Sequence, residues 1–253
     1  MLLGVDIGNT TISFGIINDN RVVKTCFLEL VPAKNEMKRK VAVLFSEILR
    51  QYPPLEKIII CSVVPSMSTL MRAVIKANTS IPLYEVGRDF IVPIKNLYRQ
   101  PGQVGQDRLV CSYAAKCLYG YPVVVIDFGT AITFDIVTHQ GDYAGGIIVP
   151  GIRLSAESLF EKTALLPKID NIKAPNHLIG RDTQESILSG IFFGYGAMCS
   201  GLIEAIFREI HGRPKIVLTG GYADKMKKFA GRRVSIIDRS LIFRGLNFLH
   251  KSI

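Results

Sequence analysis

Leu2-Leu3-Gly4-Val5-Asp6-Ile7-Gly8-Asn9-Thr10 opens the chain, and Val123-Val124-Val125-Ile126-Asp127-Phe128-Gly129-Thr130 repeats its pattern near the middle. Each apolar run has the composition of a buried strand, and a stretch rich in β-branched residues follows each glycine turn. A strand that ends in Asp-x-Gly-x-Thr and turns straight back is a recurrent way to hold nucleotide phosphates. Two such turns facing each other would form a cleft, so the repeat makes ATP the first ligand hypothesis.

The composition is that of a globular protein. The chain has 253 residues, of which 48% are hydrophobic and 21% are charged. No stretch approaches the ~18–20 consecutive apolar residues that cross a bilayer. Asp6 interrupts the N-terminal apolar run and no basic region precedes it, so a signal peptide is not expected. We therefore expect a cytoplasmic protein with no membrane partner.

The cysteines and the net charge further narrow the class of protein and its possible partners. Five cysteines without a Cys-x-x-Cys argue against a disulfide framework or a structural zinc site, and the four histidines lack metal-ligand spacing. The net charge of +10 suits either nucleic acid or an anionic substrate such as ATP. Its densest cluster lacks the series of aromatic residues of a single-strand stacking platform: Lys225, Lys227, Lys228, Arg232 and Arg233. A solvated helix face is favoured, and nucleic acid is not expected as a partner.

The order of predicted elements indicates an internal duplication. Expected strands of the first part are 2–7, 12–17, 22–28 and 58–63, with helices at 37–51 and 66–77, the latter capped by Ser66. Expected strands of the second part are 123–126, 132–137, 143–149 and 215–218. We predict an α/β protein of two halves, residues 1–119 and 120–253.

One predicted helix, residues 183–211, is apolar almost all the way round. Such a helix is expected to be buried on all sides. Gly190, Gly194 and Gly201 would let another backbone approach closely. A homodimer packed through this helix is the favoured interpretation, although a monomer of this size can also bury one such helix.

The first glycine turn carries the predicted phosphate site. Gly8 allows close backbone approach, the turn presents N–H groups, and the carboxylate of Asp6 suits Mg²⁺ held with the phosphates. The predicted ATP-binding set is Asp6, Ile7, Gly8, Asn9, Thr10, Thr11, Ile12 and Ser13. The alternative is an ordinary hairpin turn with an Asx cap. Gly220-Gly221, at a third strand end, would admit adenine or ribose, or form a simple helix-entry turn.

These elements together resemble the actin, sugar kinase and Hsp70 superfamily over nearly the whole chain. The resemblance implies two duplicated ribonuclease H-like halves, each a mixed sheet with flanking helices, and an ATP cleft between them.

An acid beside an arginine precedes the predicted helix 109–118, in Gly105-Gln106-Asp107-Arg108. Phosphorylation of an alcohol needs a group that orients and deprotonates the hydroxyl, and a carboxylate does this in many kinases. The alternative is that Asp107 caps the helix and Arg108 is solvated.

This Gly-x-Asp-Arg segment, with Tyr98 before it and Asp-x-Gly-Thr after it, is similar to type III pantothenate kinases. Further segments match that family in order and spacing: Gly145–Gly151, Thr163–Pro167, Gly180–Thr183 and Ser189-Gly190. One departure is Gln106, where a small or apolar residue is commoner; it would offer extra hydrogen bonding near the substrate.

The resemblance implies a role for each matched residue. Asp107 would accept the hydroxyl proton, Thr130 would contact ATP, and Asp127 would hold a monovalent cation, K⁺ or NH₄⁺. The implied pantothenate contacts are Tyr98, Gly105, Gln106, Asp107, Arg108 and Thr183. Thr183 also suits a helix N-cap. Family members are homodimers.

The activity implied by the resemblance is ATP-dependent phosphorylation of pantothenate to 4'-phosphopantothenate, the first step of coenzyme A biosynthesis. A non-catalytic transcriptional accessory regulator of the same family is the alternative, and the positive charge fits it loosely. The intact Asp107, Arg108, Asp127 and Thr130 favour the enzyme. A kinase or phosphatase for another small acid is a third option, which the two Asp-x-Gly turns alone do not exclude.

Overall fold

The computed structural model describes residues 1–251, which form two compact units. Unit 1 comprises residues 1–94, 98–114 and those from Ser240 onward; unit 2 comprises residues 95–97 and 115–239. The C-terminal helix α7 (Leu241–His250) therefore belongs to unit 1. The predicted division into sequence halves at residues 119 and 120 concerns a duplication and stays a prediction.

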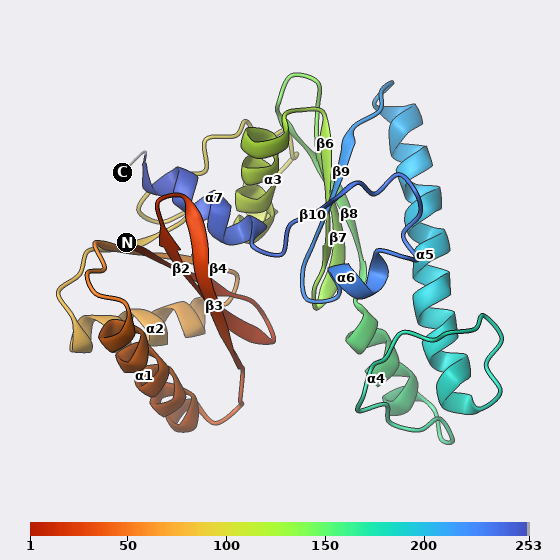
Figure 1. The fold of residues 1–253 in the computed structure, drawn as a ribbon, viewed down its shortest axis with the longest axis horizontal. Coiled ribbons are helices and arrows are strands. Elements are labelled where there is room, and N and C mark those ends of the chain that lie inside the picture. Colours follow the sequence, from red (N-terminus) through yellow and green to blue (C-terminus); the bar gives the residue numbers. More distant parts are fainter. Residues whose placement is uncertain (252–253) are drawn as a thin grey trace. The chain divides into compact units, whose positions relative to one another are not determined.

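Unit 1 is built on a five-stranded mixed sheet (Figure 1). In chain order its elements are β1 (Leu2–Ile7), β2 (Thr11–Asn18), β3 (Arg21–Glu29), α1 (Lys34–Gln51), β4 (Lys57–Ser62), α2 (Pro65–Asn78), β5 (Leu83–Glu85), a 3₁₀ turn (Pro101–Gln103), the start of α3 (Gln106–Tyr119), and α7. The strand order is β3-β2-β1-β4-β5, in which β2 is antiparallel to β1 and β3 and β4 is parallel to β1 and β5.

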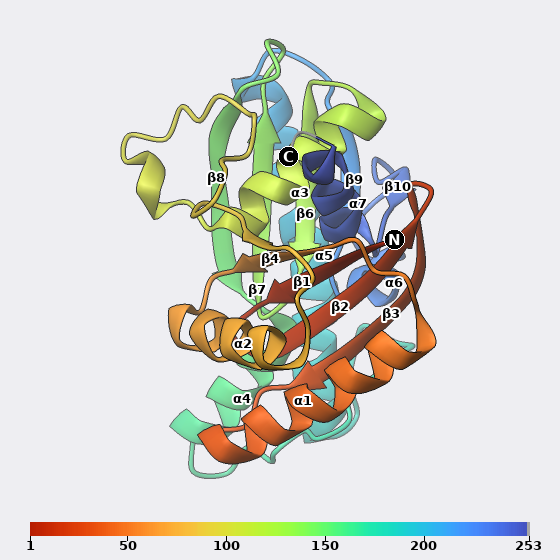
Figure 2. The same ribbon diagram turned by 90° about the vertical axis from the view of Figure 1, so that its left-hand side faces the viewer.

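The two faces of this sheet are covered by different helices. Leu3, Val5 and Ile7 alternate along β1 into one apolar core with α1 and α2, which lie together on that face (Figure 2). Gly4 and Gly15 face the other way, where a Cβ on either would meet Phe243 of α7. Since side chains alternate along a strand, Asp6 lies on the same face as Gly4. The carboxylate at the end of β1 is thus directed away from α1 and α2.

Unit 2 repeats the sheet of unit 1. Its elements are β6 (Val123–Phe128), β7 (Ala131–Val137), β8 (Tyr143–Pro150), α4 (Ile152–Lys162), α5 (Thr183–Glu209), β9 (Lys215–Thr219), α6 (Ala223–Met226) and β10 (Ile236–Ile237). The order β8-β7-β6-β9-β10 has the same sequence of antiparallel and parallel pairs as β3-β2-β1-β4-β5. The predicted fold class, two mixed α/β sheets with flanking helices, is confirmed.

Three predicted helix starts were wrong by a few residues. Helix α1 begins at Lys34 and α3 at Gln106, earlier than predicted. Helix α2 begins at Pro65, with Val64 and not Ser66 as its N-cap, because proline is pre-set for a first helical position and needs no N–H partner. The hydroxyl of Ser62 accepts the N–H of Val64 at 3.1 Å and fixes the chain just before this helix.

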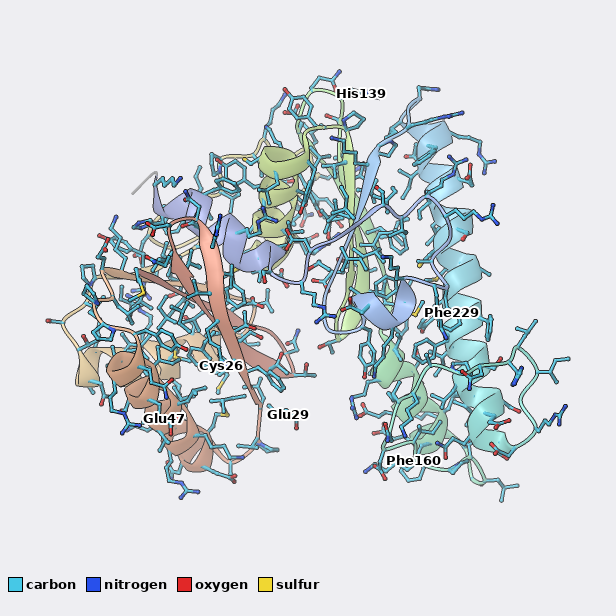
Figure 3. All side chains as sticks on the ribbon, in the orientation of Figure 1. Cys26, Glu29, Glu47, His139, Phe160 and Phe229 are labelled. Carbon is cyan, nitrogen blue, oxygen red and sulfur yellow. The ribbon has the colours of Figure 1, made fainter. Side chains whose placement is uncertain are left out.

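Helix α5 is not buried on all sides, which corrects the prediction. Ile187, Ile191 and Cys199 pack into the core of unit 2, and Phe229 lies against the helix, its ring in contact with those of two of its phenylalanines (Figure 3). The opposite side is open, because unit 2 supplies a layer on one side only. Its exposed residues include Gly190, Gly194, Ala197 and Gly201.

By length and composition α5 would also qualify as a membrane span, but 39% of its most apolar window is buried inside the protein. Core helices pass the same test, so the signal is weak. The five cysteines are free thiols, in line with the predicted lack of a disulfide framework.

Candidate active site

The first glycine turn joins β1 to β2 in unit 1. Asp6 lies opposite Ser13 of β2 and next to Cys61 of β4. The Gly8 N–H donates to the carbonyl of Thr11 at 3.0 Å, which closes a turn whose Asn9 and neighbouring Thr10 are exposed. A Cβ on Gly8 would meet only the Thr11 carbonyl, at 3.6 Å. The backbone here is accessible, as a phosphate-binding turn requires.

Asp107 lies in the first turn of α3. Its Oδ1 accepts the N–H of Arg108 at 2.8 Å. Gly105 leaves the room that the carboxylate occupies, since a Cβ there would stand 2.5 Å from Oδ1 and 3.3 Å from Val63. Burial raises the pKa of Asp107, and the Arg108 N–H and guanidinium partly oppose that rise. A partly desolvated carboxylate with a raised pKa is a stronger base than an exposed one, which suits proton abstraction.

Asp6 and Asp107 both influence the thiol of Cys61. Burial raises the pKa of the Cys61 thiol well above its ordinary value, and the charges of Asp6, Asp107 and Glu85 raise it further. The thiol therefore stays protonated and is inert as a nucleophile. Two carboxylates from distant parts of the sequence thus act on one thiol of unit 1.

The second glycine turn lies in unit 2 and has two further glycines packed against it. Asp127 is the penultimate residue of β6 and lies opposite Thr133, and the Gly129 N–H donates to the Ala131 carbonyl at 3.2 Å. The Gly151 N–H donates to the carbonyl of Thr130 at 3.0 Å, and a Cβ on Gly151 would also stand 2.6 Å from the Gly129 carbonyl. Gly151 thus closes this turn from the β8 side.

Gly220 closes the same turn from the β9 side. It has a φ of +88°, and a Cβ there would overlap Oδ1 of Asp127 and stand 2.7 Å from the carbonyl carbon of Phe128. Unit 2 therefore assembles Asp127, Thr130 and Gly220. Gly221 is exposed, with no atom within 4 Å of a Cβ. The Gly220 carbonyl accepts the N–H of Ala223 at 3.2 Å, so Gly220 also begins the entry into α6.

The remaining predicted residues lie on other segments of the two units. Tyr98 is partly buried in the loop before α3. Thr183 is the first residue of α5 and exposed, but Asp182 is the N-cap: its carboxylate accepts the Glu185 N–H at 2.7 Å. The predicted capping role of Thr183 is therefore wrong, because the acid before it takes that position.

Two glycines that contact site residues did not enter the predicted set. Gly151 stood among the matched segments without a role, and Gly87 was not considered. Gly87 has a φ of +79°, and a Cβ there would stand 2.8 Å from Cδ of Gln106. The Gln106 side chain thus lies against the Gly87 backbone. The sequence signal for Gly87 was the turn composition of Val86-Gly87-Arg88-Asp89 after a short strand.

The basic cluster does not present free aromatic rings. Lys225 lies over Tyr222, Lys228 over Phe229 and Arg233 over Phe207. These rings are covered by cations of the same segment, so they do not form a stacking surface for bases. Within residues 1–251 no group of three or more His, Cys, Asp or Glu side chains has the arrangement of a metal site.

The two mixed sheets have the fold of the actin and sugar kinase class. A solved ROK family glucokinase from Streptomyces griseus, in complex with glucose and AMPPNP, shares the fold: TM-score 0.58, 11% identity, 100% of this chain and 99% of that one. A structure from Campylobacter jejuni described as a Baf family transcriptional activator also matches, with a TM-score of 0.58, 21% identity and coverage of 99% and 98%. At these identities the likeness shows the fold alone.

Sequence comparison identifies the family. The type III pantothenate kinase profile matches residues 2–205. A type III pantothenate kinase from Persephonella marina is 40% identical over 232 residues, which cover 90% of each chain. The chain belongs to the type III pantothenate kinase family, as its motifs predicted.

Proposed function

We propose that this protein transfers the γ-phosphoryl group of ATP to the primary hydroxyl of pantothenate, forming 4'-phosphopantothenate and ADP at the start of coenzyme A biosynthesis. The observation that carries the proposal is the partly buried carboxylate of Asp107, held by Gly105 and the Arg108 N–H in a chain of this family. A regulatory role is not favoured, because the chain keeps the acidic residues that only catalysis needs.

The phosphates of ATP are assigned to the first turn. This assignment is supported by the accessible backbone at Gly8 and by the exposed polar side chains of Asn9 and Thr10. Further ATP contacts are assigned to Thr130, Gly220 and Gly221. Asp6 offers the carboxylate oxygens that Mg²⁺ prefers, directly or through water. When bound, Mg²⁺ offsets the charge of the phosphates.

Asp107 is assigned as the base. Its carboxylate accepts the hydroxyl proton while the hydroxyl oxygen bonds to the γ-phosphorus. The bond from that phosphorus to the β–γ bridging oxygen breaks, and ADP leaves with the electron pair. Tyr98, Gly105, Gln106, Arg108 and Thr183 are assigned to pantothenate binding. Positioning and electrostatics supply most of the rate in phosphoryl transfer.

A monovalent cation, K⁺ or NH₄⁺, is assigned to Asp127. The donor chemistry supports this: a carboxylate lies at the penultimate position of β6, and the Gly220 backbone packs against its Oδ1. The test is activity in potassium, sodium and potassium-free buffer. Equal rates in the three buffers would remove the cation from Asp127.

A homodimer through α5 is part of the proposal. Its support is the open seam of Gly190, Gly194, Ala197 and Gly201, since residues of this size let two helices approach closely. Large apolar side chains of unit 2 are exposed nearby in the chain, on α4 and the segment before α5: Leu154, Phe160, Leu165, Leu178 and Ile179. An exposed apolar surface of this kind is typical of an interface. We also assign the enzyme to the cytoplasm.

The decisive experiment is a coupled assay that follows ADP release with pantothenate and ATP. We expect turnover with pantothenate, and a loss of at least about 10²-fold in Asp107→Asn, in line with general-base contributions. Turnover of wild type without pantothenate, or an Asp107→Asn variant as fast as wild type, would overturn the proposal. Sedimentation equilibrium tests the dimer, with Gly194→Glu placed in the seam and Lys38→Glu, at an exposed lysine of α1, as the charge control on unit 1.

A further inference from the structure

A tight turn after β5 is held in place by charge. In residues 85–90, here called the Gly87 turn, the Gly87 N–H donates to the Phe90 carbonyl at 2.8 Å. Asp89 accepts the N–H of Glu85 at 2.8 Å, so the two arms are bonded to each other. Because Gly87 has a φ of +79°, the apex favours glycine.

Arg72 of α2 anchors both arms of this turn. Its guanidinium lies 3.1 Å from Glu85 and 3.6 Å from Asp89, and Ser68 one helical turn earlier also donates to Glu85. The side chains of Arg72 and Glu85 are 16% and 14% exposed. An ion pair so withdrawn from solvent is less screened than a surface pair. The turn is therefore fixed to α2 at a defined position.

The apex of the turn contacts the residue before the proposed base. A Cβ on Gly87 would stand 2.8 Å from Cδ and 3.0 Å from Nε2 of Gln106. Gln106 is the first residue of α3, and Asp107 is the second. The helix start thus has Gly87 on the side of Gln106 and Gly105 on the side of the Asp107 carboxylate.

We propose that Gly87 is a positioning residue for the phosphoryl-transfer step: its bare backbone seats the Gln106 side chain and so fixes the first turn of α3 with the Asp107 carboxylate. The proposal rests on the proposed function of Asp107. A displacement of about 1 Å at a reacting group can lower a rate by roughly 10²-fold, so a poorly seated Gln106 is expected to affect turnover.

Gly87→Ala tests this, with Gly120→Ala as a matched control. Both glycines have a positive φ, +79° and +77°, but a Cβ on Gly120 meets nothing within 4 Å. Both variants carry the same backbone strain, and only Gly87→Ala presses on Gln106. We expect kcat to fall about 10-fold in Gly87→Ala and to stay within about 2-fold of wild type in Gly120→Ala, with KM for ATP little changed in both.

A second-site variant separates positioning from general destabilisation. Gln106→Ala removes the atoms that the new Cβ would meet, so Gly87→Ala/Gln106→Ala is expected to recover kcat to that of Gln106→Ala alone. A Gly87→Ala enzyme that behaves like Gly120→Ala, or a double variant no faster than Gly87→Ala, would overturn the proposal.

The carboxyl titration of Asp107, followed by ¹³C NMR, gives a readout that does not depend on turnover. Because burial raises this pKa, a displaced helix start is expected to lower it in Gly87→Ala but not in Gly120→Ala. An unchanged pKa in Gly87→Ala would also overturn the proposal. Wild type and Asp107→Asn measured in the same assays show separately whether the proposed function itself holds.

Discussion

The two glycine turns have the same strands around them but different surroundings. Each follows a strand with an identical burial pattern and pairs its aspartate with a hydroxyl residue, Asp6 with Ser13 and Asp127 with Thr133. The first turn is one residue longer than the second. Four residues lie between its last paired strand residues, Ile7 and Ile12, and three lie between Phe128 and Ile132 of the second. A Cβ on Gly8 would meet one atom, at 3.6 Å, whereas Gly151 and Gly220 pack directly against the second turn.

The different glycine contacts agree with the different roles that we propose for the two turns. An accessible turn exposes backbone N–H groups and can accept a ligand as large as a triphosphate. The second turn has its aspartate packed against the Gly220 backbone, which holds the carboxylate in place for the small cation that we propose there. Gly151 and Gly220 let other segments of unit 2 pack against the second turn. A Cβ on Gly8, by contrast, would meet only the Thr11 carbonyl, at 3.6 Å.

Neutralising the two aspartates is expected to have unequal effects on turnover. Asp6→Asn should lower kcat by about 10²-fold or more, since Mg²⁺ loses a carboxylate that orients it on the phosphates. Asp127→Asn should lower activity less, to the rate that wild type shows without potassium. The measurement is the coupled assay across a potassium series. Equal losses and the same potassium response in both variants would mean that the turns share one role.

A methyl group added at Gly151, which packs against the second turn, should lower stability more than one added at Gly8 of the first turn. Gly151→Ala places a Cβ against the carbonyls of Thr130 and Gly129, and overpacking of this kind lowers the free energy of unfolding by about 1–3 kcal/mol. Gly8→Ala meets only one atom, at 3.6 Å, so unfolding should change by less than about 1 kcal/mol while KM for ATP rises. Urea unfolding and ATP kinetics measure the two effects. A loss of stability in Gly8→Ala as large as in Gly151→Ala would contradict the contrast.

The sheets also differ two residues beyond each paired hydroxyl. Gly15 of β2 makes room for the Phe243 ring, whereas Asp135 of β7 is buried and accepts hydrogen bonds from Thr133 and Tyr143, each at 2.8 Å. Tyr143→Phe removes one of these bonds. We expect a loss of about 0.5–1.5 kcal/mol in unfolding free energy without a change in KM for ATP, which chemical denaturation measures. Tyr84→Phe, on a partly buried tyrosine of β5, is the control.

The strands and turns could be predicted because their signals are local. Apolar runs ended by Asp-x-Gly fix β1 and β6, and the repeat of that order predicts the duplicated sheet. The open side of α5 could not be predicted, because an apolar helix in sequence does not reveal whether a neighbouring element of the same chain covers it. The pairing of Gly87 with Gln106 and of Gly220 with Asp127 depends on tertiary contacts between segments far apart in sequence. The N-cap Asp182 was missed because its neighbour Thr183 is an equally good capping residue.

The smallest effect expected concerns the stability contributed by Asp107 and its dependence on pH. Because its pKa is raised in the folded protein, the folded state binds more protons than the unfolded state between the two pKa values. Stability due to this group therefore falls as pH rises from the ordinary aspartate value through the raised one. Asp107→Asn carries no such charge, so it should be more stable than wild type at neutral pH, and the difference should shrink in acid. The effect is limited because the Arg108 N–H and guanidinium stabilise the charged form. Urea unfolding at a series of pH values measures it, and a wild type that is more stable than Asp107→Asn at neutral pH would show that these contacts outweigh burial.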